Sequence, residues 1–256
     1  MIHVEIDDVS VVTIDRPEVH NALDIATLIE LEDVFSRLEG DDSVRVIIVT
    51  GAGKKVFVAG GDIADLGTRR GLAHYLEYAD VIHRVFSKIE RCTKPTIAAV
   101  NGHALGGGVE LMLSLDIRIV SEEARFGLPE ITLGLFPGAG GTQRSIRQLP
   151  LCRAKEMMYT GDPISAADAV AIGLANRAVP SDRVLDESRT MASKIAERSP
   201  IALALLRRTI QDGGEMPLRA ALAYEQAMIG LTFDTDDAHE GIAAFLERRA
   251  PRFEGR

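Results

Sequence analysis

The segment that most constrains the fold is residues 95–116, where a strand-like run passes through three glycines into an apolar helix-like run. Thr96 to Val100 are apolar and partly β-branched, and turn residues follow them, which indicates a short buried strand. Gly106 to Gly108 come next, and then the sequence VELMLSL, which is rich in helix formers. We therefore predict a strand, a tight glycine turn and a buried helix.

Glu110 is the unusual residue of this segment, because it places a carboxylate in the first turn of a helix that otherwise resembles core. A buried acid needs a polar partner or a chemical role. The free N–H groups at a helix N-terminus favour negative charge and also hold substrate oxygens. A linker with a solvent-exposed Glu is the alternative. Both flanks are apolar and no Ser-rich or charged tract surrounds the glycines, which favours a functional turn.

Composition restricts the class of protein. The chain has 256 residues, 46% hydrophobic and 26% charged, as expected of a globular protein with a sizeable core. Its net charge of −9 argues against a broad nucleic-acid surface. The N-terminus lacks the apolar stretch of a secretory signal, and no segment is long and apolar enough to span a bilayer. The two cysteines have no metal-type spacing, so we expect a cytoplasmic protein with reduced thiols and no membrane partner.

The order of the predicted elements indicates an α/β fold. Strand-like runs alternate with helices in the first part of the chain, beginning with a hairpin over residues 2–14 and a helix over 25–38 capped by Asp24. A longer amphipathic helix is predicted over 72–91, and further helical segments are predicted over 144–159 and 164–172. The final third is predicted to be helical over 183–198, 201–212, 217–230 and 236–249. This arrangement predicts an α/β body with a helical C-terminal part.

Familiar catalytic and nucleotide-binding motifs are absent. No phosphate-binding G-x-x-x-x-G-K-[ST], dinucleotide G-x-G-x-x-G, G-x-S-x-G or H-E-x-x-H pattern occurs, and no metal-ligand cluster is evident. What remains is a constellation of two glycine-terminated strands and two carboxylates. Gly61 and Gly107 can each offer a backbone N–H to a developing oxyanion. Glu110 and Glu130 can divide acid and base work.

Several motifs together resemble a known family. They are FVAGGDI (57–63), AAVNGHALGGGVEL (98–111), FGLPEITLGLFPGAGGTQR (126–144) and TGDPISAADAVAIGLANRAV (160–179), with DRPEVHNAL (15–23) and AFLERRAPRFEG (244–255) at the two ends. In this order and spacing they resemble the enoyl-CoA hydratase/isomerase, or crotonase, superfamily, and the resemblance covers essentially the whole chain.

The resemblance implies a particular architecture. It implies a crotonase-like spiral of ββα units over residues 1–195 and a helical region over 196–256 that covers the active site and supports trimerisation. The implied partners are an acyl-CoA substrate and further copies of the chain, in a homotrimer or a hexamer. No cofactor is implied, because CoA is part of the substrate.

The resemblance also implies roles for individual residues. The backbone N–H groups of Gly61 and Gly107 form the oxyanion hole, Glu110 deprotonates the attacking water, and Glu130 delivers a proton to C2. Members that only isomerise double bonds often keep just the second glutamate, so the pair favours a 2-enoyl-CoA hydratase of fatty-acid or related acyl-CoA breakdown. The further substrate-binding residues that the resemblance implies are Ala22, Ala59, Asp62, Ile63 and Gly138.

Two departures and several alternatives accompany this interpretation. Ala64 stands where many members carry a Lys, and Gly61 where Ala is common. Lys54, Lys55, Arg16 or the C-terminal arginines of a neighbouring copy are the alternative cations for CoA. The same two-carboxylate frame serves isomerases, hydrolases of 3-hydroxyacyl-CoA, and hydratases of branched or aromatic acyl groups. A non-catalytic, RNA-binding relative is the alternative from another class, and the intact carboxylates and the charge of −9 argue against it.

Overall fold

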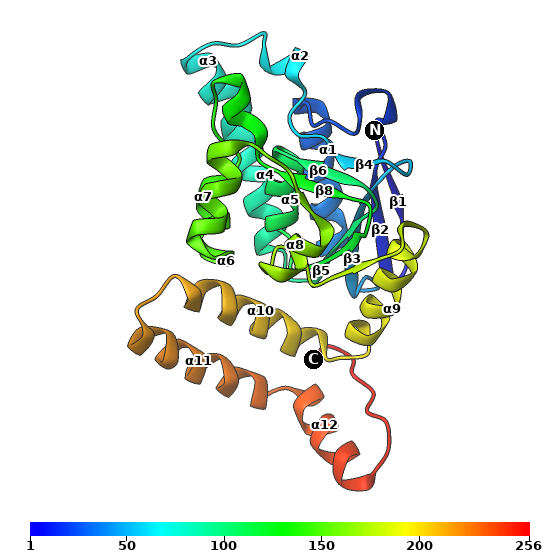
Figure 1. Ribbon diagram of the computed structural model, residues 1–256. Coiled ribbons are helices and arrows are strands. Elements are labelled where there is room, and N and C mark those ends of the chain that lie inside the picture. Colours follow the sequence, from blue (N-terminus) through cyan, green and yellow to red (C-terminus); the bar gives the residue numbers. More distant parts are fainter.

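The computed structural model describes all residues from 1 to 256 and contains two β-sheets surrounded by helices (Figure 1). The larger sheet has six strands in the order β1-β2-β3-β5-β7-β10. Its strands are β1 (Ile2–Glu5), β2 (Val9–Ile14), β3 (Val46–Gly51), β5 (Thr96–Val100), β7 (Ile117–Ser121) and β10 (Arg177–Val179). β1 and β2 form the predicted antiparallel hairpin, and every other pairing in this sheet is parallel.

The smaller sheet carries the site described below. It consists of β4 (Val56–Val58), β6 (His103–Leu105), β8 (Arg125–Gly127) and β9 (Ile164–Ser165), in that spatial order. β4, β6 and β8 are parallel, and β9 joins the edge of the sheet antiparallel to β8.

The chain alternates between the two sheets and then forms helix, which produces the predicted spiral of ββα units. β3 and β4 lead into α2 (Ile63–Leu66), α3 (Leu72–His74) and α4 (Asp80–Arg91). β5 and β6 lead into α5 (Gly107–Leu113). β7 and β8 lead into a 3-10 helix (Pro129–Leu133) and α6 (Gly141–Gln148). The predicted fold class is therefore confirmed.

Helices cover both faces of the larger sheet. α1 (Ile25–Glu39) begins at Asp24, whose carboxylate accepts from the Thr27 N–H at 2.8 Å, as the predicted cap requires. α1 packs against α4, and a core of 40 buried residues fills the space between these helices, the strands and α5. A second core cluster, which includes Val46 and Ile48, lies under α9 (Val184–Ala196) on the opposite face.

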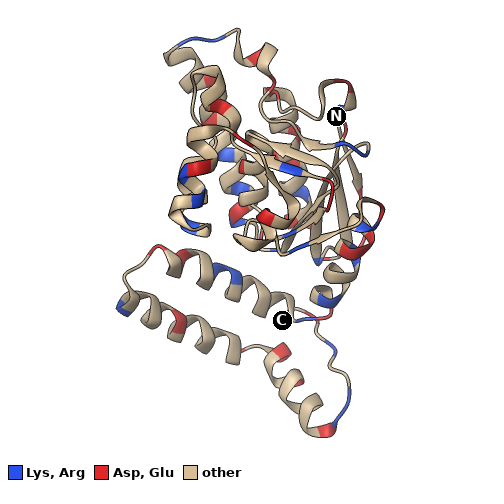
Figure 2. Cartoon of the chain, in the orientation of Figure 1, with Lys and Arg blue, Asp and Glu red and all other residues tan.

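The last three helices stand apart from the two sheets in Figure 1. They are α10 (Pro200–Gly214), α11 (Leu218–Phe233) and α12 (Asp236–Glu247). The buried Arg207 joins α10 to the body, because its guanidinium contacts the Asp116 carboxylate at 2.8 Å and donates to the carbonyls of Ile89 and Cys92. Figure 2 shows α11 as largely uncharged along its length.

The structure differs from the sequence prediction in four places. Tyr75–Ala79 is a π-helical turn inside the helix predicted over 72–91, and the short strand β6 lies between β5 and the glycine turn. Ile164–Ser165 is strand rather than helix, because it pairs with β8 and becomes the edge strand of the smaller sheet. The helical stretch after Arg144 is divided at Leu149-Pro150, where proline lacks the N–H that would continue α6 into α7 (Leu151–Thr160).

Two further observations concern the chain as a whole. No helix combines the length and the apolar character needed to cross a membrane. No group of three or more His, Cys, Asp and Glu side chains is placed to hold a metal ion.

Candidate active site

The site lies where three neighbouring parallel strands end. β4 is followed by Ala59-Gly60-Gly61, β6 by Gly106-Gly107, and β8 by a short turn that carries Glu130. Because parallel strands end at the same edge of a sheet, these segments converge, as ligand-binding loops do in other open α/β sheets. They line a cavity of about 560 Å³.

The peptides of Gly61 and Gly107 lie beside each other. A methyl group built on Gly107 would lie 3.3 Å from the Gly61 nitrogen, and one built on Gly60 would lie 3.4 Å from the Gly107 nitrogen. Neither N–H donates to an acceptor elsewhere in the chain. Gly107 is the first residue of α5, where the N–H has no intrahelical acceptor. Two adjacent free donors are the requirement for binding one oxygen that gains negative charge.

Gly106 has a backbone conformation that only glycine adopts readily, with φ at +51° and ψ at −120°. A Cβ atom at this position would also lie 2.9 Å from Oε1 of Glu130. The missing side chain therefore allows both the sharp turn into α5 and the approach of Glu130 to Gly106.

Glu110 is the deeper of the two carboxylates, with 3% of its surface exposed. Its Oε1 accepts hydrogen bonds from the backbone N–H groups of Ala139 and Gly141, both at 2.7 Å. The pKa of Glu110 is raised to about 7, chiefly by burial and also by the neighbouring Glu130, although the two N–H bonds and Arg144 oppose this shift. The hydrogen bonds thus favour the ionised carboxylate in a place where burial alone would strongly disfavour it.

Glu130 lies in the 3-10 helix Pro129–Leu133 and has a different environment. Burial raises the pKa of this carboxyl as well. Its Oε2 is buried without a hydrogen-bond partner in the chain. The two glutamates therefore differ in their hydrogen bonding, because Oε1 of Glu110 accepts from two backbone N–H groups whereas Oε2 of Glu130 accepts from none.

The remaining substrate-binding candidates fall into two groups. Ala59, Ile63 and Gly138 line the cavity together with the two glycines and the two glutamates. Asp62 and Ala22 do not line it. The Asp62 carboxylate caps α2 by accepting from the Ala64 N–H at 3.1 Å.

Asp62 and Ala22, the two candidates outside the cavity, both contact the side chain of Arg16. Its guanidinium pairs with Asp62 at 3.3 Å and with Asp24 at 2.8 Å, and it donates to the Ala22 carbonyl. Through Arg16, Asp62 and Ala22 therefore link the chain segments beside the cavity rather than lining it.

Several cavity-lining residues were not among the sequence candidates. They include Leu66, Arg69, His74, Tyr78, Ile82, Leu133, Leu135 and Phe136. Tyr78 carried a signal, because it precedes the core residue Ile82 by one helical repeat. Ile82 itself is a core position of the helix predicted over 72–91. The other residues lie on turns or short helices, where sequence periodicity gives no orientation.

The ββα spiral with this cavity defines a crotonase-type protein, and comparison with known proteins agrees. The family model described as enoyl-CoA hydratase/isomerase matches residues 5–256. The short-chain-enoyl-CoA hydratase of Clostridium acetobutylicum is 41% identical over 94% of this chain and 92% of its own length. The 2,3-dehydroadipyl-CoA hydratase of Escherichia coli is 41% identical over 97% of this chain and 96% of its own.

Solved structures give the same result. The enoyl-CoA hydratase of Bacillus anthracis superposes with a TM-score of 0.96 at 37% identity, covering 100% of this chain and 99% of the other. The chain therefore belongs to the enoyl-CoA hydratase/isomerase family, and it is an enzyme.

Proposed function

We propose that the protein adds water to trans-2-enoyl-CoA thioesters to give 3-hydroxyacyl-CoA. The observation that carries this proposal is one cavity with two free, adjacent backbone N–H groups and two glutamates in contrasting environments. The relatives named hydratases, at about 41% identity over nearly the whole chain, support the same reaction.

The thioester carbonyl oxygen binds between the N–H groups of Gly61 and Gly107. As water attacks C3 of the conjugated system, negative charge moves onto this oxygen. Preorganised donors stabilise that charge more than they stabilise the neutral substrate, and each donor of this kind typically lowers the barrier by about 2.7–4 kcal/mol.

The two glutamates handle the protons. Glu110, whose ionised form is favoured by the N–H groups of Ala139 and Gly141, binds the water and takes one proton as the C3–O bond forms. Glu130 enters the reaction protonated and gives its proton to C2 when the enolate collapses. Proton transfer between the two carboxyls or with solvent restores the starting state. The reaction moves only protons and forms C–O and C–H bonds, so we propose that it needs no cofactor beyond the CoA of its substrate.

The remainder of the cavity suits the acyl part of the substrate. Leu133, Leu135 and Phe136 from the turn before α6, with Ile82 from α4, give its wall an apolar character. We place the adenine-bearing part of CoA along the segments that contain Ala22 and Asp62. Arg16 is already neutralised by Asp24 and Asp62, whereas Lys54 and Lys55 are exposed in the loop before β4. These two lysines are therefore the better candidates for the CoA phosphates.

We further propose that the working form is a homotrimer or a hexamer in which α10–α12 form much of the contact. Large apolar side chains on these helices face solvent in the single chain, including Leu218 (75% exposed), Phe245 (82%) and Leu246 (75%). A patch of this kind on a folded chain commonly marks a protein contact. Neither Cys92 nor Cys152 forms a disulfide, which fits our proposal of a cytoplasmic enzyme of acyl-CoA breakdown.

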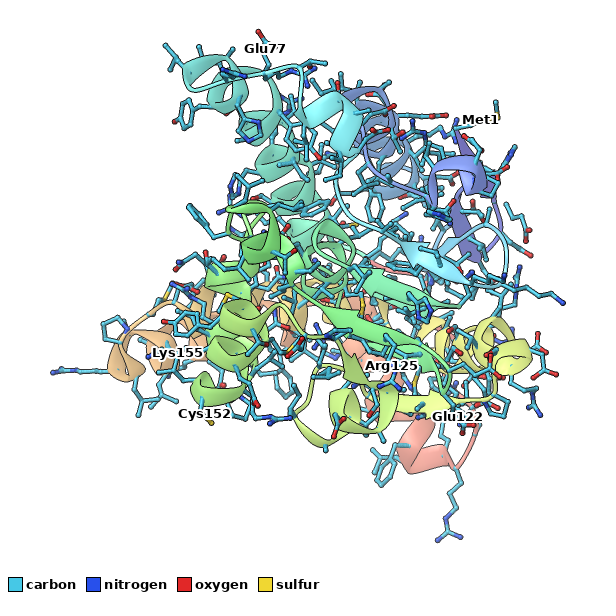
Figure 3. All side chains as sticks on the ribbon, turned by 45° about the horizontal axis from the view of Figure 1, so that its top comes forward. Met1, Glu77, Glu122, Arg125, Cys152 and Lys155 are labelled. Atoms are coloured by element: carbon cyan, nitrogen blue, oxygen red, sulfur yellow. The ribbon has the colours of Figure 1, made fainter.

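The test is turnover of crotonyl-CoA and longer 2-enoyl-CoAs, followed by loss of the enoyl-thioester absorbance and by product mass. We expect Glu110→Gln and Glu130→Gln each to lower kcat by at least about 100-fold, the scale of positioned acid–base catalysis. Glu122→Gln is the matched control, because Glu122 is exposed in the turn between β7 and β8 (Figure 3). Near wild-type hydration by either glutamine variant would disprove the assigned roles.

A further inference from the structure

Tyr78 occupies an unusual place in the helix that borders the cavity. It lies in the π-helical turn Tyr75–Ala79, where the Asp80 N–H donates to the Tyr75 carbonyl five residues earlier. Such turns are rare and recur at functional sites because they redirect a side chain within a continuous helix. The preceding residue, Glu77, points away from the body in Figure 3, whereas Tyr78 is 4% exposed and lines the cavity.

The Tyr78 hydroxyl makes one hydrogen bond, to Leu23, and Leu23 in turn bonds to the residues on both sides of Gly61. The hydroxyl donates to the Leu23 carbonyl at 3.0 Å. The same carbonyl accepts from the Asp62 N–H at 3.0 Å, and the Leu23 N–H donates to the Gly60 carbonyl at 2.8 Å. Leu23 thus holds the peptides on both sides of Gly61 in a parallel bridge. In such a bridge the Gly61 N–H points away from Leu23, toward the space beside Gly107.

Gly61 and Tyr78 also depend on each other sterically. A Cβ atom at Gly61 would lie 2.7 Å from the Tyr78 hydroxyl oxygen and 2.9 Å from Cδ1 of Leu66. The Leu66 methyl is the end of a flexible side chain, but the Tyr78 oxygen is fixed by its bond to Leu23 in a buried site. The hydroxyl therefore occupies the volume that an alanine methyl would need at position 61.

We propose that Tyr78 is a positioning residue for the oxyanion hole: its bond to the Leu23 carbonyl fixes the direction of the Gly61 N–H, and the absence of a side chain at Gly61 makes room for this bond. This inference rests on the proposed function, because it assigns Tyr78 to the polarisation of the thioester carbonyl. The hydroxyl acts through Leu23 and does not itself contact the reacting atoms.

The first experiment compares Tyr78→Phe with the wild type and with Tyr75→Phe, a control in the same turn whose ring is exposed. Tyr78→Phe removes one oxygen and leaves the Leu23 carbonyl bonded to Asp62, so the fold is retained. We expect kcat for crotonyl-CoA to fall about fivefold to tenfold, the scale of one lost hydrogen bond, with KM within about twofold. A rise in KM with unchanged kcat would mean that the hydroxyl binds substrate directly, and it would overturn the proposal.

The second readout is spectroscopic. A slowly reacting, conjugated aryl-enoyl-CoA absorbs at longer wavelength when its thioester carbonyl is polarised by hydrogen bonds. We expect a red shift on binding to the wild type, a smaller shift with Tyr78→Phe, and an unchanged shift with Tyr75→Phe. A full red shift with Tyr78→Phe would contradict the proposal, because the thioester carbonyl would then be fully polarised without the Tyr78 hydroxyl.

The third measurement uses the steric relation between the two residues. Gly61→Ala displaces the Tyr78 hydroxyl, so we expect it to lower kcat and to reduce the red shift. This variant tests the same contact without changing Tyr78. In the Tyr78→Phe background the added methyl meets no hydroxyl, so the same change is expected to cost several-fold less. Equal costs in both backgrounds would overturn the coupling.

These outcomes separate the two proposals. If the wild type hydrates crotonyl-CoA and shifts the probe while the Tyr78 variants behave like it, only the role of Tyr78 fails. If the wild type neither hydrates the ester nor shifts the probe, the proposed function itself fails.

Discussion

At the scale of single residues, the burial of Glu110 has a consequence for stability as well as for chemistry. Its pKa is raised from an ordinary value of 4.5 to about 7, chiefly by burial. The folded protein thus holds this proton more tightly than the unfolded chain does. The contribution of Glu110 to the free energy of unfolding is therefore fully present below about pH 4.5 and is lost as the pH rises through about 7.

We therefore predict that Glu110→Gln is more stable than the wild type at alkaline pH. The amide oxygen of glutamine can still accept from Ala139 and Gly141, but the side chain has no charge to bury. The gain is about 3 kcal/mol at pH 8.5, from about 1.36 kcal/mol per pKa unit, and it shrinks toward pH 5. Thermal or denaturant unfolding of both proteins across this pH range measures it. Glu122→Gln should show no such trend, and a stability gain that does not depend on pH would contradict the burial argument.

At the scale of elements, the proposed catalytic carboxylate of Glu110 depends on a loop that is held by a neighbouring helix. The loop that donates from Ala139 and Gly141 precedes α6, and Arg144 of α6 reaches back to the Ala139 carbonyl at 3.1 Å. The same guanidinium pairs with Glu90 of α4 at 2.7 Å. Arg144 thereby joins α4, α6 and the loop that holds Glu110.

We predict that Arg144→Met lowers kcat about tenfold and moves the acidic limb of the pH–rate profile to higher pH. Methionine keeps the apolar stem but loses the loop contact, and the Arg144 charge lowers the pKa of Glu110 in the wild type. The pH dependence of kcat/KM for crotonyl-CoA is the measurement. Arg147→Met is the control, since Arg147 lies on the same helix and is half exposed. An unshifted acidic limb would show that Arg144 does not act on Glu110.

Local sequence patterns were enough to predict many elements. The hairpin of β1 and β2 follows from alternating residues, and α1 follows from apolar spacing and the Asp24 cap. β6 was not predicted, because three residues after a turn are too short to show a period. The π-helical turn was also not predicted. In this turn the Tyr78 hydroxyl donates to the carbonyl of Leu23, 55 residues away in the chain, and a contact over that distance leaves no local sequence pattern.

The candidate site shows the same division. Its glycines and glutamates could be chosen from motifs, and the structure places Gly61, Gly107, Glu110 and Glu130 around one cavity. The hydrogen bonds that Glu110 accepts could not be predicted in this way, because their two donors are backbone N–H groups 29 and 31 residues away. Backbone donors leave no residue-type signal, so only the fold reveals them.

At the scale of the whole molecule, the C-terminal helices α10–α12 bear on how copies of the chain assemble. These helices expose large apolar side chains, whereas the two sheets and α1, α4 and α5 enclose a continuous core. The structure and the proposed trimer together imply that much of this apolar surface is covered by other copies of the chain.

We predict that the protein sediments as a multiple of three 27.7 kDa chains at micromolar concentration. Analytical ultracentrifugation measures the mass, and Leu222→Asp on α11, where Leu222 is 54% exposed, is expected to shift it toward the monomer. Arg219→Gln, a polar change on the same helix, serves as the control. A monomeric wild type over the whole concentration range would disprove the proposed assembly.

The most direct test of the central claim is turnover of crotonyl-CoA in water enriched in heavy oxygen, with the product identified by mass. If Glu110 activates water for addition to the enoyl thioester, the wild type gives a 3-hydroxyacyl-CoA that carries the heavy oxygen. Glu110→Gln gives almost none in the same time. A product of unchanged mass would indicate isomerisation, and release of free CoA would indicate thioester hydrolysis; either result would contradict the assignment of this site to hydration.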